Sequence, residues 1–267
     1  MNEENKPPII NKKNADNYLL NKFRSIDKTA VFVITACLML LFGYYSKTIK
    51  QPMSIHDAAQ SGDIEAVKGF LAAGMDVNAI DENRGMTALV YAVDKGHKEI
   101  VEILISEGAD VNVMVSNDEG VDGFTPLLFA VDKGHKEIVE ILISDGADVN
   151  VMVSNDEGVD GFTSLFFAAR SGHTEVAELL IANGAEVNVK LINDEGKVSC
   201  TPLFFAARSG HTEVAELLIA NGSEINAKDE NILTPLDYAT LEKQNETADF
   251  LRKHGGKTGE ELEFEGN

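Results

Sequence analysis

Histidine recurs at regular intervals along this sequence, and histidine is the commonest side chain that binds transition metals. The four equivalent histidines are His97, His135, His173 and His211. If each belongs to its own packed helix, neighbouring histidines lie about 8–10 Å apart. Two ligands of one zinc ion must each lie about 2 Å from it. Neighbouring histidines therefore cannot share an ion, and we expect no metal site.

A second candidate for chemistry is an acidic motif with glycine, N-D-E-G-V-D-G at 117–123 and 155–161 and N-D-E-G-K at 193–197. Clustered carboxylate and amide oxygens beside glycine are suited to bind Ca²⁺. The D-x-D-x-D-G spacing of an EF-hand is absent, however, and these residue types are also those of hairpin turns. We expect solvated turns, and a structural or surface module whose acidic tips bind Ca²⁺ is the alternative function.

The remaining sequence gives no indication of catalysis. It contains no nucleophile paired with a general base, no glycine-rich phosphate loop and no spaced carboxylate pair outside positions that recur along the chain. We therefore expect no catalytic residues, no enzyme activity, no cofactor and no small-molecule substrate.

All of these residues belong to a repeated unit that must position them. One copy starts at Gly123 and reads GFTPLLFAVDKGHKEIVEILISDGADVN, and closely similar segments precede and follow it. Equivalent threonines recur at a constant interval, at Thr87, Thr125, Thr163 and Thr201. The next threonine, Thr234, follows after a shorter interval. With looser copies at both ends, the chain contains about six units.

Each unit predicts two short helices. Thr125 and Pro126 mark a helix start, because the threonine hydroxyl accepts a backbone N–H and the φ of proline is preset. A nearly all-apolar helix follows and stops at Gly134, which can adopt positive φ. A second, amphipathic helix runs from about Lys136 to Gly146. Helices of about nine residues are unstable alone, so neighbouring units must stack to bury a shared face.

Three motifs in this unit resemble the ankyrin repeat: T-P-L-x-x-A at 125–130, G-H-x-E-I-V at 134–139 and G-A-D-V-N at 146–150. The match extends over about 52–256. The resemblance implies an all-α fold, an ankyrin α-solenoid of about six helix pairs with projecting hairpin fingers and a concave face that binds partner proteins. It also implies that the histidine at each turn between helices is structural.

Two features depart from the family pattern. Histidine usually follows T-P-L in the family, but here the corresponding residues are Val90, Leu128, Phe166, Phe204 and Asp237. This difference indicates apolar packing between most neighbouring units. The family's usual period is about 33 residues. The interval from Thr201 to Thr234 matches it, whereas the intervals between the earlier threonines are longer, so those units have elongated fingers.

Apolar residues flank the turn on both arms of the long fingers, which predicts true β-hairpins that align side by side. Some of their apolar side chains are expected to pack between fingers. The others are expected to be exposed, and exposed apolar patches indicate a binding partner. The finger residues that we expect to bind a partner are Met114, Val115, Phe124, Met152, Val153 and Phe162.

The ends of the first helices match the variable concave positions of the family. These partner-binding candidates are Asp94, Lys95, Asp132, Lys133, Arg170, Ser171, Arg208 and Ser209. Their charge changes from mixed to basic along the array, so we expect an acidic patch on the partner opposite the third and fourth long units. The leading hypothesis is a membrane-anchored protein–protein interaction scaffold.

The net charge of −21 is distributed unevenly. Residues 1–50 contain eight Lys and Arg against four acidic residues, so the rest of the chain is strongly acidic. An acidic body argues against nucleic acid as a partner, because nucleic acid requires a basic surface. The two cysteines, Cys37 and Cys200, exclude a disulfide framework.

The N-terminal region differs from the repeats. Residues 1–28 lack a sustained apolar period, which predicts a disordered tail, whereas the segment 29–46 carries no charged side chain. A helix over that segment would span about 27 Å, close to a hydrocarbon core of about 30 Å, so we predict one transmembrane helix. The alternatives are a buried core helix, a cleaved signal peptide and a lipoprotein lipobox at Cys37.

Flanking charge predicts the orientation of that helix. Five Lys and Arg precede it closely and two follow it, so the N-terminus is expected in the cytoplasm. The repeats would then lie on the non-cytoplasmic side, the periplasm in a bacterium, with the cytoplasmic face of the membrane as the alternative. The predicted segments after the helix are repeats at 53–86, 87–124, 125–162, 163–200, 201–233 and 234–256, within a repeat domain at 52–256, and an acidic tail at 257–267.

Overall fold

A computed structural model describes residues 53–116, 123–154, 159–192 and 200–266. The chain divides into two units, Met1–Met53 and Ser54–Asn267, and the helices described below belong to the second. They form six successive pairs and one further helix. The bounds are α3 Ile55–Ser61, α4 Ile64–Ala72, α5 Ala88–Asp94, α6 Lys98–Ser106, α7 Pro126–Asp132, α8 Lys136–Ser144, α9 Ser164–Ser171, α10 Thr174–Ala182, α11 Pro202–Ser209, α12 Thr212–Ala220, α13 Pro235–Leu241, α14 Asn245–Lys253 and α15 Gly259–Gly266.

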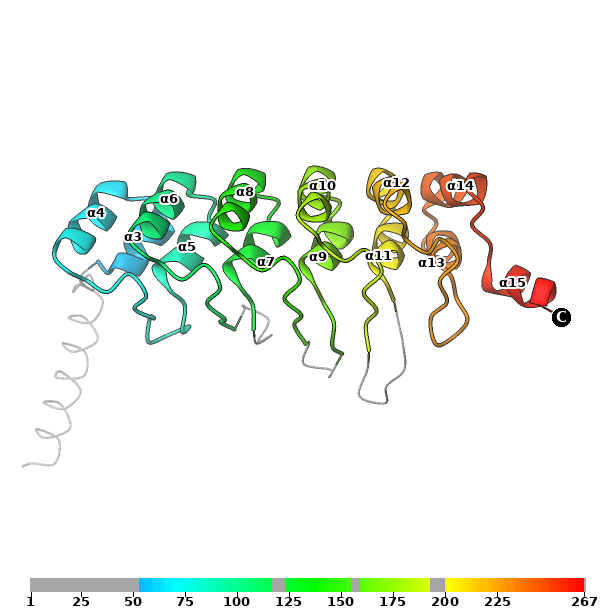
Figure 1. Ribbon diagram of the computed structural model, residues 1–267, viewed down its shortest axis with the longest axis horizontal. Coiled ribbons are helices and arrows are strands. Elements are labelled where there is room, and N and C mark those ends of the chain that lie inside the picture. The colour runs from blue at the N-terminus through cyan, green and yellow to red at the C-terminus, as the bar shows by residue number, and fades with distance from the viewer. Residues whose placement is uncertain (1–52, 117–122, 155–158, 193–199, 267) are drawn as a thin grey trace, which may run out of the picture. The chain divides into compact units, whose positions relative to one another are not determined.

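The helix pairs stack in two layers (Figure 1). The first helices of the pairs form the layer next to the loops; they are α3, α5, α7, α9, α11 and α13. The second helices form the layer away from the loops; they are α4, α6, α8, α10, α12 and α14. Each first helix contacts the first helix of the next pair, and the second helices do the same. The predicted all-α solenoid of helix pairs is therefore confirmed.

The first helices begin where the sequence predicts. Thr125 has extended backbone geometry, and its side chain accepts a hydrogen bond from the Leu128 N–H at 3.4 Å. Pro126 occupies the first turn, where no intrahelical donor is lost. Pro126 to Val131 are all buried, so α7 is covered on every side by the repeats around it. A helix this short persists because its neighbours bury it.

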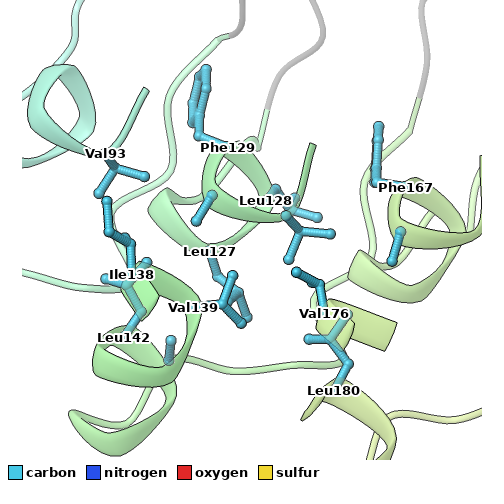
Figure 2. Packing of buried hydrophobic residues seen from close by; sticks show 14 of the residues in the cluster. Val93, Leu127, Leu128, Phe129, Ile138, Val139, Leu142, Phe167, Val176 and Leu180 are labelled. Carbon is cyan, nitrogen blue, oxygen red and sulfur yellow. The ribbon is translucent and has the colours of Figure 1, made fainter. Parts of the chain in front are cut away.

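The core runs between the two layers and from pair to pair (Figure 2). Leu127 of α7 and Leu142 of α8 are almost completely buried. Phe129 and Phe167 point from α7 and α9 toward the loop side. They pack there against Phe124, whose ring centroid lies 5.0 Å from that of Phe129 and 5.2 Å from that of Phe167. The first-helix layer is thus buried from both sides.

Asparagine side chains join neighbouring repeats. In one such contact, Asn112 Nδ2 donates to the Gly146 carbonyl at 3.1 Å, and Asn112 Oδ1 accepts from the Asp148 N–H at 3.0 Å. Equivalent pairs of bonds are made by Asn78, Asn150, Asn188 and Asn226. We call these five residues the asparagine ladder. They fix the start of each finger relative to the next repeat.

The described parts of the fingers contain isolated β-bridges and no continuous strand, so the predicted β-hairpins are corrected to single antiparallel bridges there. Val115 pairs with Phe124, and Val153 pairs with Phe162. A third bridge joins two fingers, because Asp160 N donates to Ile192 O at 2.8 Å and Ile192 N to Asp160 O at 3.0 Å. Val115 and Phe124 are buried with the helices, which ties the base of this finger to the core.

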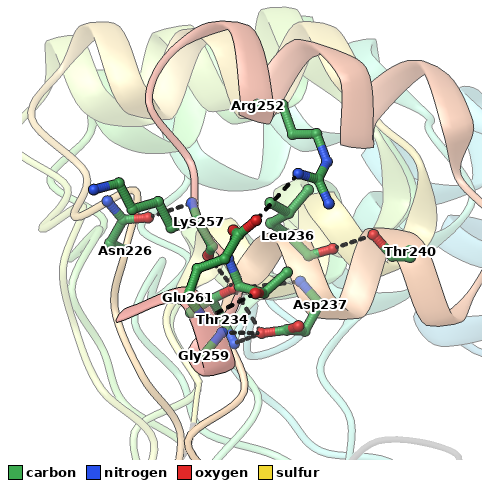
Figure 3. A network of polar contacts seen from close by, with 10 residues as sticks. Asn226, Thr234, Leu236, Asp237, Thr240, Arg252, Lys257, Gly259 and Glu261 are labelled. Carbon is green, nitrogen blue, oxygen red and sulfur yellow. Dashed lines mark hydrogen bonds and ion pairs between the residues drawn. The ribbon is translucent and has the colours of Figure 1, made fainter. Parts of the chain in front are cut away.

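The C-terminal segment is fixed to the last repeat (Figure 3). Asp237 Oδ2 accepts from the backbone N–H groups of Thr234 at 2.9 Å and Gly259 at 2.8 Å. Thr234 Oγ1 also donates to the Lys257 carbonyl at 2.8 Å. Residues 259–266, which the sequence analysis assigned to an acidic tail, therefore form helix α15. Asp237, at the position of the usual family histidine, provides the anchor.

No helix in the described ranges has the length and apolar character needed to cross a bilayer. The longest helices there have nine residues, so they are about 14 Å long against a hydrocarbon core of about 30 Å. This finding contradicts the predicted localisation as a single-pass membrane protein, and we withdraw it. The segment at 29–46 itself lies outside the described residues.

One buried hydroxyl predicts a stabilising substitution. Ser223 is 7% exposed, and its Oγ has no hydrogen-bond partner, whereas the equivalent residues of earlier repeats are Ala109, Ala147 and Ala185. Because an unsatisfied buried hydroxyl is costly, Ser223→Ala is expected to raise the free energy of unfolding by about 1 kcal/mol. Urea denaturation would measure it. Ser106→Ala, which removes an exposed hydroxyl, is the control, and equal effects of both substitutions would contradict the prediction.

Candidate protein-binding surface

The predicted residues at the ends of the first helices all lie in the layer next to the loops. Asp94, Asp132, Arg170 and Arg208 occupy equivalent positions near the C-termini of α5, α7, α9 and α11. Lys95, Lys133, Ser171 and Ser209 follow them directly. Lys95, Lys133, Arg170 and Arg208 are exposed, and the aspartates and serines are partly buried. The structure thus brings the eight residues together as one row that crosses four repeats.

The charges in this row are paired. Lys95 Nζ lies 2.7 Å from Asp94 Oδ2 in the same repeat. Asp132 Oδ1 lies 3.1 Å from Nη2 of Arg170, which belongs to the repeat that follows that of Asp132. Arg208 lies 3.3 Å from Glu242. Exposed ion pairs of this kind contribute little to stability, and a guanidinium has five N–H donors. The arginines can therefore bind a partner carboxylate while they keep these contacts.

Arg170 has a further contact that orients its side chain. Its Cζ lies 5.1 Å from the centroid of the Phe167 ring, within the range of a cation–π interaction. Phe167 belongs to the same helix and is 9% exposed. The guanidinium is thus held between an aromatic ring and the Asp132 carboxylate, which limits its freedom before any partner binds.

The structure divides the six predicted finger residues into two groups. Met114 and Met152 are 63% and 57% exposed. Val115, Val153 and Phe124 are each less than 9% exposed, and Phe162 is partly buried against the core. Of these six residues, the two methionines therefore offer the most accessible apolar surface to a partner. A third exposed apolar residue, Ile80, occupies the equivalent place in the first finger and was not among the predicted residues.

The recurring histidines connect repeats. His211 Nε2 lies 3.1 Å from the Arg170 carbonyl of the preceding repeat, and His97 and His173 make equivalent contacts with Gln60 and Asp132. The ring of each histidine lies against the glycine at the end of the first helix of the preceding repeat, as His211 does against Gly172 at the end of α9. These contacts are structural, as the resemblance implied.

The sequence analysis predicted that no part of the chain holds a metal site. Within the residues that the structure describes, no group of three or more His, Cys, Asp or Glu could hold a metal ion. Most of each acidic finger tip lies outside those residues, including 117–122, 155–158 and 193–199. The Ca²⁺ alternative concerned those tips, and no described residue supports it.

Cys200 stands where two earlier repeats have phenylalanine, at Phe124 and Phe162. A small cavity of about 50 Å³ adjoins it, lined also by Phe204, Phe205, Arg208 and Tyr238. Burial raises the pKa of the Cys200 thiol to about 11. The sequence signal for this cavity was the loss of an aromatic residue at a repeated position.

Two family models match the chain. The model described as ankyrin repeats (3 copies) matches residues 55–153 and 115–191, and ankyrin repeats (many copies) matches residues 165–219 and 203–252. The chain belongs to the ankyrin repeat family. Ankyrin repeats generally mediate interactions between proteins, through the extended surface that stacked units form.

Curated relatives share short parts of this ankyrin-repeat chain. It is 33% identical over 70 residues to human Ankyrin repeat domain-containing protein 40, covering 26% of the chain and 19% of the relative. It is 38% identical over 71 residues to Palmitoyltransferase AKR1 of Debaryomyces hansenii, covering 27% of the chain and 8% of the relative. The match to the mouse 2-5A-dependent ribonuclease is 37% over 68 residues, covering 26% and 9%.

These matches span less than a fifth of each relative. The enzyme names of two relatives describe whole proteins in which the matched repeats are a small part. The expectation that this chain is not an enzyme therefore stays a prediction.

Proposed function

We propose that this ankyrin-repeat chain is a scaffold that binds another protein through its loop-side surface. The surface combines the row of charged first-helix ends, from Asp94 to Ser209, with the exposed finger methionines. The observation that carries the proposal is the exposure of Met114 and Met152, at 63% and 57%, beside finger residues that are buried. Methionine is flexible and polarisable, which suits a surface that must adapt to a partner.

The charged row supplies specificity to the same surface. Its polarity changes along the array, from Asp–Lys pairs in the repeats of α5 and α7 to Arg–Ser pairs in those of α9 and α11. Charges at the rim of an interface select partners and orient them more than they add affinity. An acidic patch on the partner is proposed opposite Arg170 and Arg208.

The proposal is tested by replacing both methionines. The full-length double variant Met114→Ser/Met152→Ser is expected to bind the partner of the wild type at least about tenfold more weakly than the wild type does. The reason is that the apolar contact area of both methionines is lost. Quantitative affinity capture from the source cells identifies the partner, and titration with that purified partner gives the affinity. Phe264→Ser is the matched control, since Phe264 is 77% exposed on α15.

Circular dichroism should show the same helix content for all three proteins, because the substituted side chains are exposed. A double variant that binds the partner as tightly as the wild type and Phe264→Ser would contradict the proposed surface.

A further inference from the structure

One position of the repeat forms an exposed row along the fingers. It lies two residues after each asparagine of the ladder, and its residues are Ile80, Met114, Met152, Lys190 and Lys228. We call this set the finger row. The ladder bonds hold each asparagine to the following repeat, so the row residues advance by one repeat at a time.

The finger row is distinct from its neighbours on either side. The residues before it, such as Val113 and Val151, are partly buried, and those after it, such as Val115 and Val153, are buried. The row residues are exposed: Ile80 and Met114 at 63% and Met152 at 57%, with Lys190 and Lys228 also exposed. The exposed side chains thus form a single line across five fingers.

The line changes character after its third member. The first three residues are apolar, and the last two are lysines in a part of the chain that is strongly acidic. Among the residues that the structure describes, Lys190 has one distant ion pair, at 3.9 Å to Glu224, and its side chain is 46% exposed. Both ammonium groups are therefore accessible to a carboxylate. A partner that fits the whole line must be apolar along one part and acidic along the next.

The general distance between packed helices of neighbouring repeats is close to the length of two turns of an α-helix. Packed helices of neighbouring repeats lie about 8–10 Å apart, and seven residues of an α-helix advance about 10.5 Å while returning to nearly the same face. A strand residue at a similar distance, three positions on, faces the opposite side. Polyproline segments prefer aromatic-lined grooves, but the row holds isoleucine, methionine and lysine, and Phe124, which pairs with Val115 next to the row, is 4% exposed.

We infer that the finger row binds an amphipathic helix of the partner protein, with apolar residues at heptad spacing over the first three fingers and Asp or Glu over the fourth and fifth. This inference rests on the proposed function and adds the partner's secondary structure and charge order. One residue of each heptad of the partner helix contacts one finger. Pairing of its acidic residues with Lys190 and Lys228 therefore fixes the register of the helix along the row.

The test uses two synthetic helical peptides and the full-length chain. The first has leucine at every seventh position over three heptads and glutamate at that position in the next two. The second replaces those glutamates by lysines. The wild type is expected to bind the first peptide about tenfold more tightly than the second at low salt, because two ion pairs are exchanged for two repulsions.

Reversal of the charge at both lysines should reverse the preference for the first peptide over the second. Lys190→Glu/Lys228→Glu is expected to bind the second peptide more tightly than the first, and Lys68→Glu/Lys253→Glu, with the same net charge but substitutions outside the row, should keep the wild-type order. Fluorescence anisotropy would measure the affinity of each of the three proteins for each of the two peptides. Failure of the first peptide to bind at about 1 mM, or an unchanged order in Lys190→Glu/Lys228→Glu, would overturn the inference.

The outcomes separate this inference from the proposed function. If the methionine double variant loses its natural partner but the charge reversal has no effect on peptide preference, the loop-side surface stands and the helical, acidic partner is wrong. If the methionine double variant also keeps its natural partner, both fail.

Discussion

Replacement of Gly172 by alanine is expected to lower the free energy of unfolding by about 3 kcal/mol. Gly172 ends α9 with φ at 75°, and a Cβ there would lie 2.5 Å from Nδ1 of His211. The left-handed backbone costs an L-residue about 1–2 kcal/mol. Displacement of the His211 ring also breaks its contact with the Arg170 carbonyl, which adds about 1 kcal/mol. Urea or thermal denaturation measures the change.

Gly184 is the matched control in the same repeat. Its φ is 88°, but no atom lies within 4 Å of the position that a Cβ would take. Gly184→Ala should therefore show the backbone cost alone, about 2 kcal/mol. In a His211→Ala background the additional cost of Gly172→Ala should disappear, as a double-mutant cycle would show. Equal costs at the two glycines would mean that the histidine does not couple these repeats.

Alkylation of Cys200 is expected to be about 100-fold slower in the folded chain than in the unfolded chain at pH 8. Burial raises the pKa of this thiol from 9.0 to about 11, and only the thiolate reacts, so two pKa units reduce the reactive fraction about 100-fold. The rate with iodoacetamide should continue to rise with pH up to about pH 11. A Cys37→Ser variant makes Cys200 the single reacting thiol.

The same shift links Cys200 to stability. Because the folded pKa lies above the unfolded value, the fold favours the neutral thiol, and the stabilisation is complete below pH 9 and lost as pH rises through 11. Reaction in concentrated urea supplies the reference rate. A rate profile in the folded chain that levels off near pH 9 would show that burial does not shift the pKa of the Cys200 thiol.

The sequence determined the helix pairs and the family of this chain. Thr125, Pro126 and Gly134 give local signals for helix starts and ends, because capping and positive φ depend on residue type at a given position. Repetition of those signals then required stacking, since single pairs cannot bury their apolar face. The structural role of the recurring histidines at the turn between the helices followed from the same resemblance, whereas their contact with the preceding repeat did not.

The tertiary structure decided which finger residues are exposed. Alternation along a finger shows that neighbouring side chains point to opposite sides, but it does not show which side the core occupies. Met114 and Val115 are both apolar, and the contacts of Val115 with Phe124 and the helices place it inside. The predicted finger residues therefore could not be sorted into exposed and buried ones before the fold was known.

Contacts between distant residues were also decided by the structure alone. Asp237 fixes the N–H of Gly259, and Arg170 pairs with Asp132 of the preceding repeat. Neither pair lies within one helix turn or one finger, so no local pattern in the sequence indicates it. The sequence determines local conformation because that depends on adjacent residues, whereas exposure and long-range pairing depend on which repeats the folded chain brings into contact.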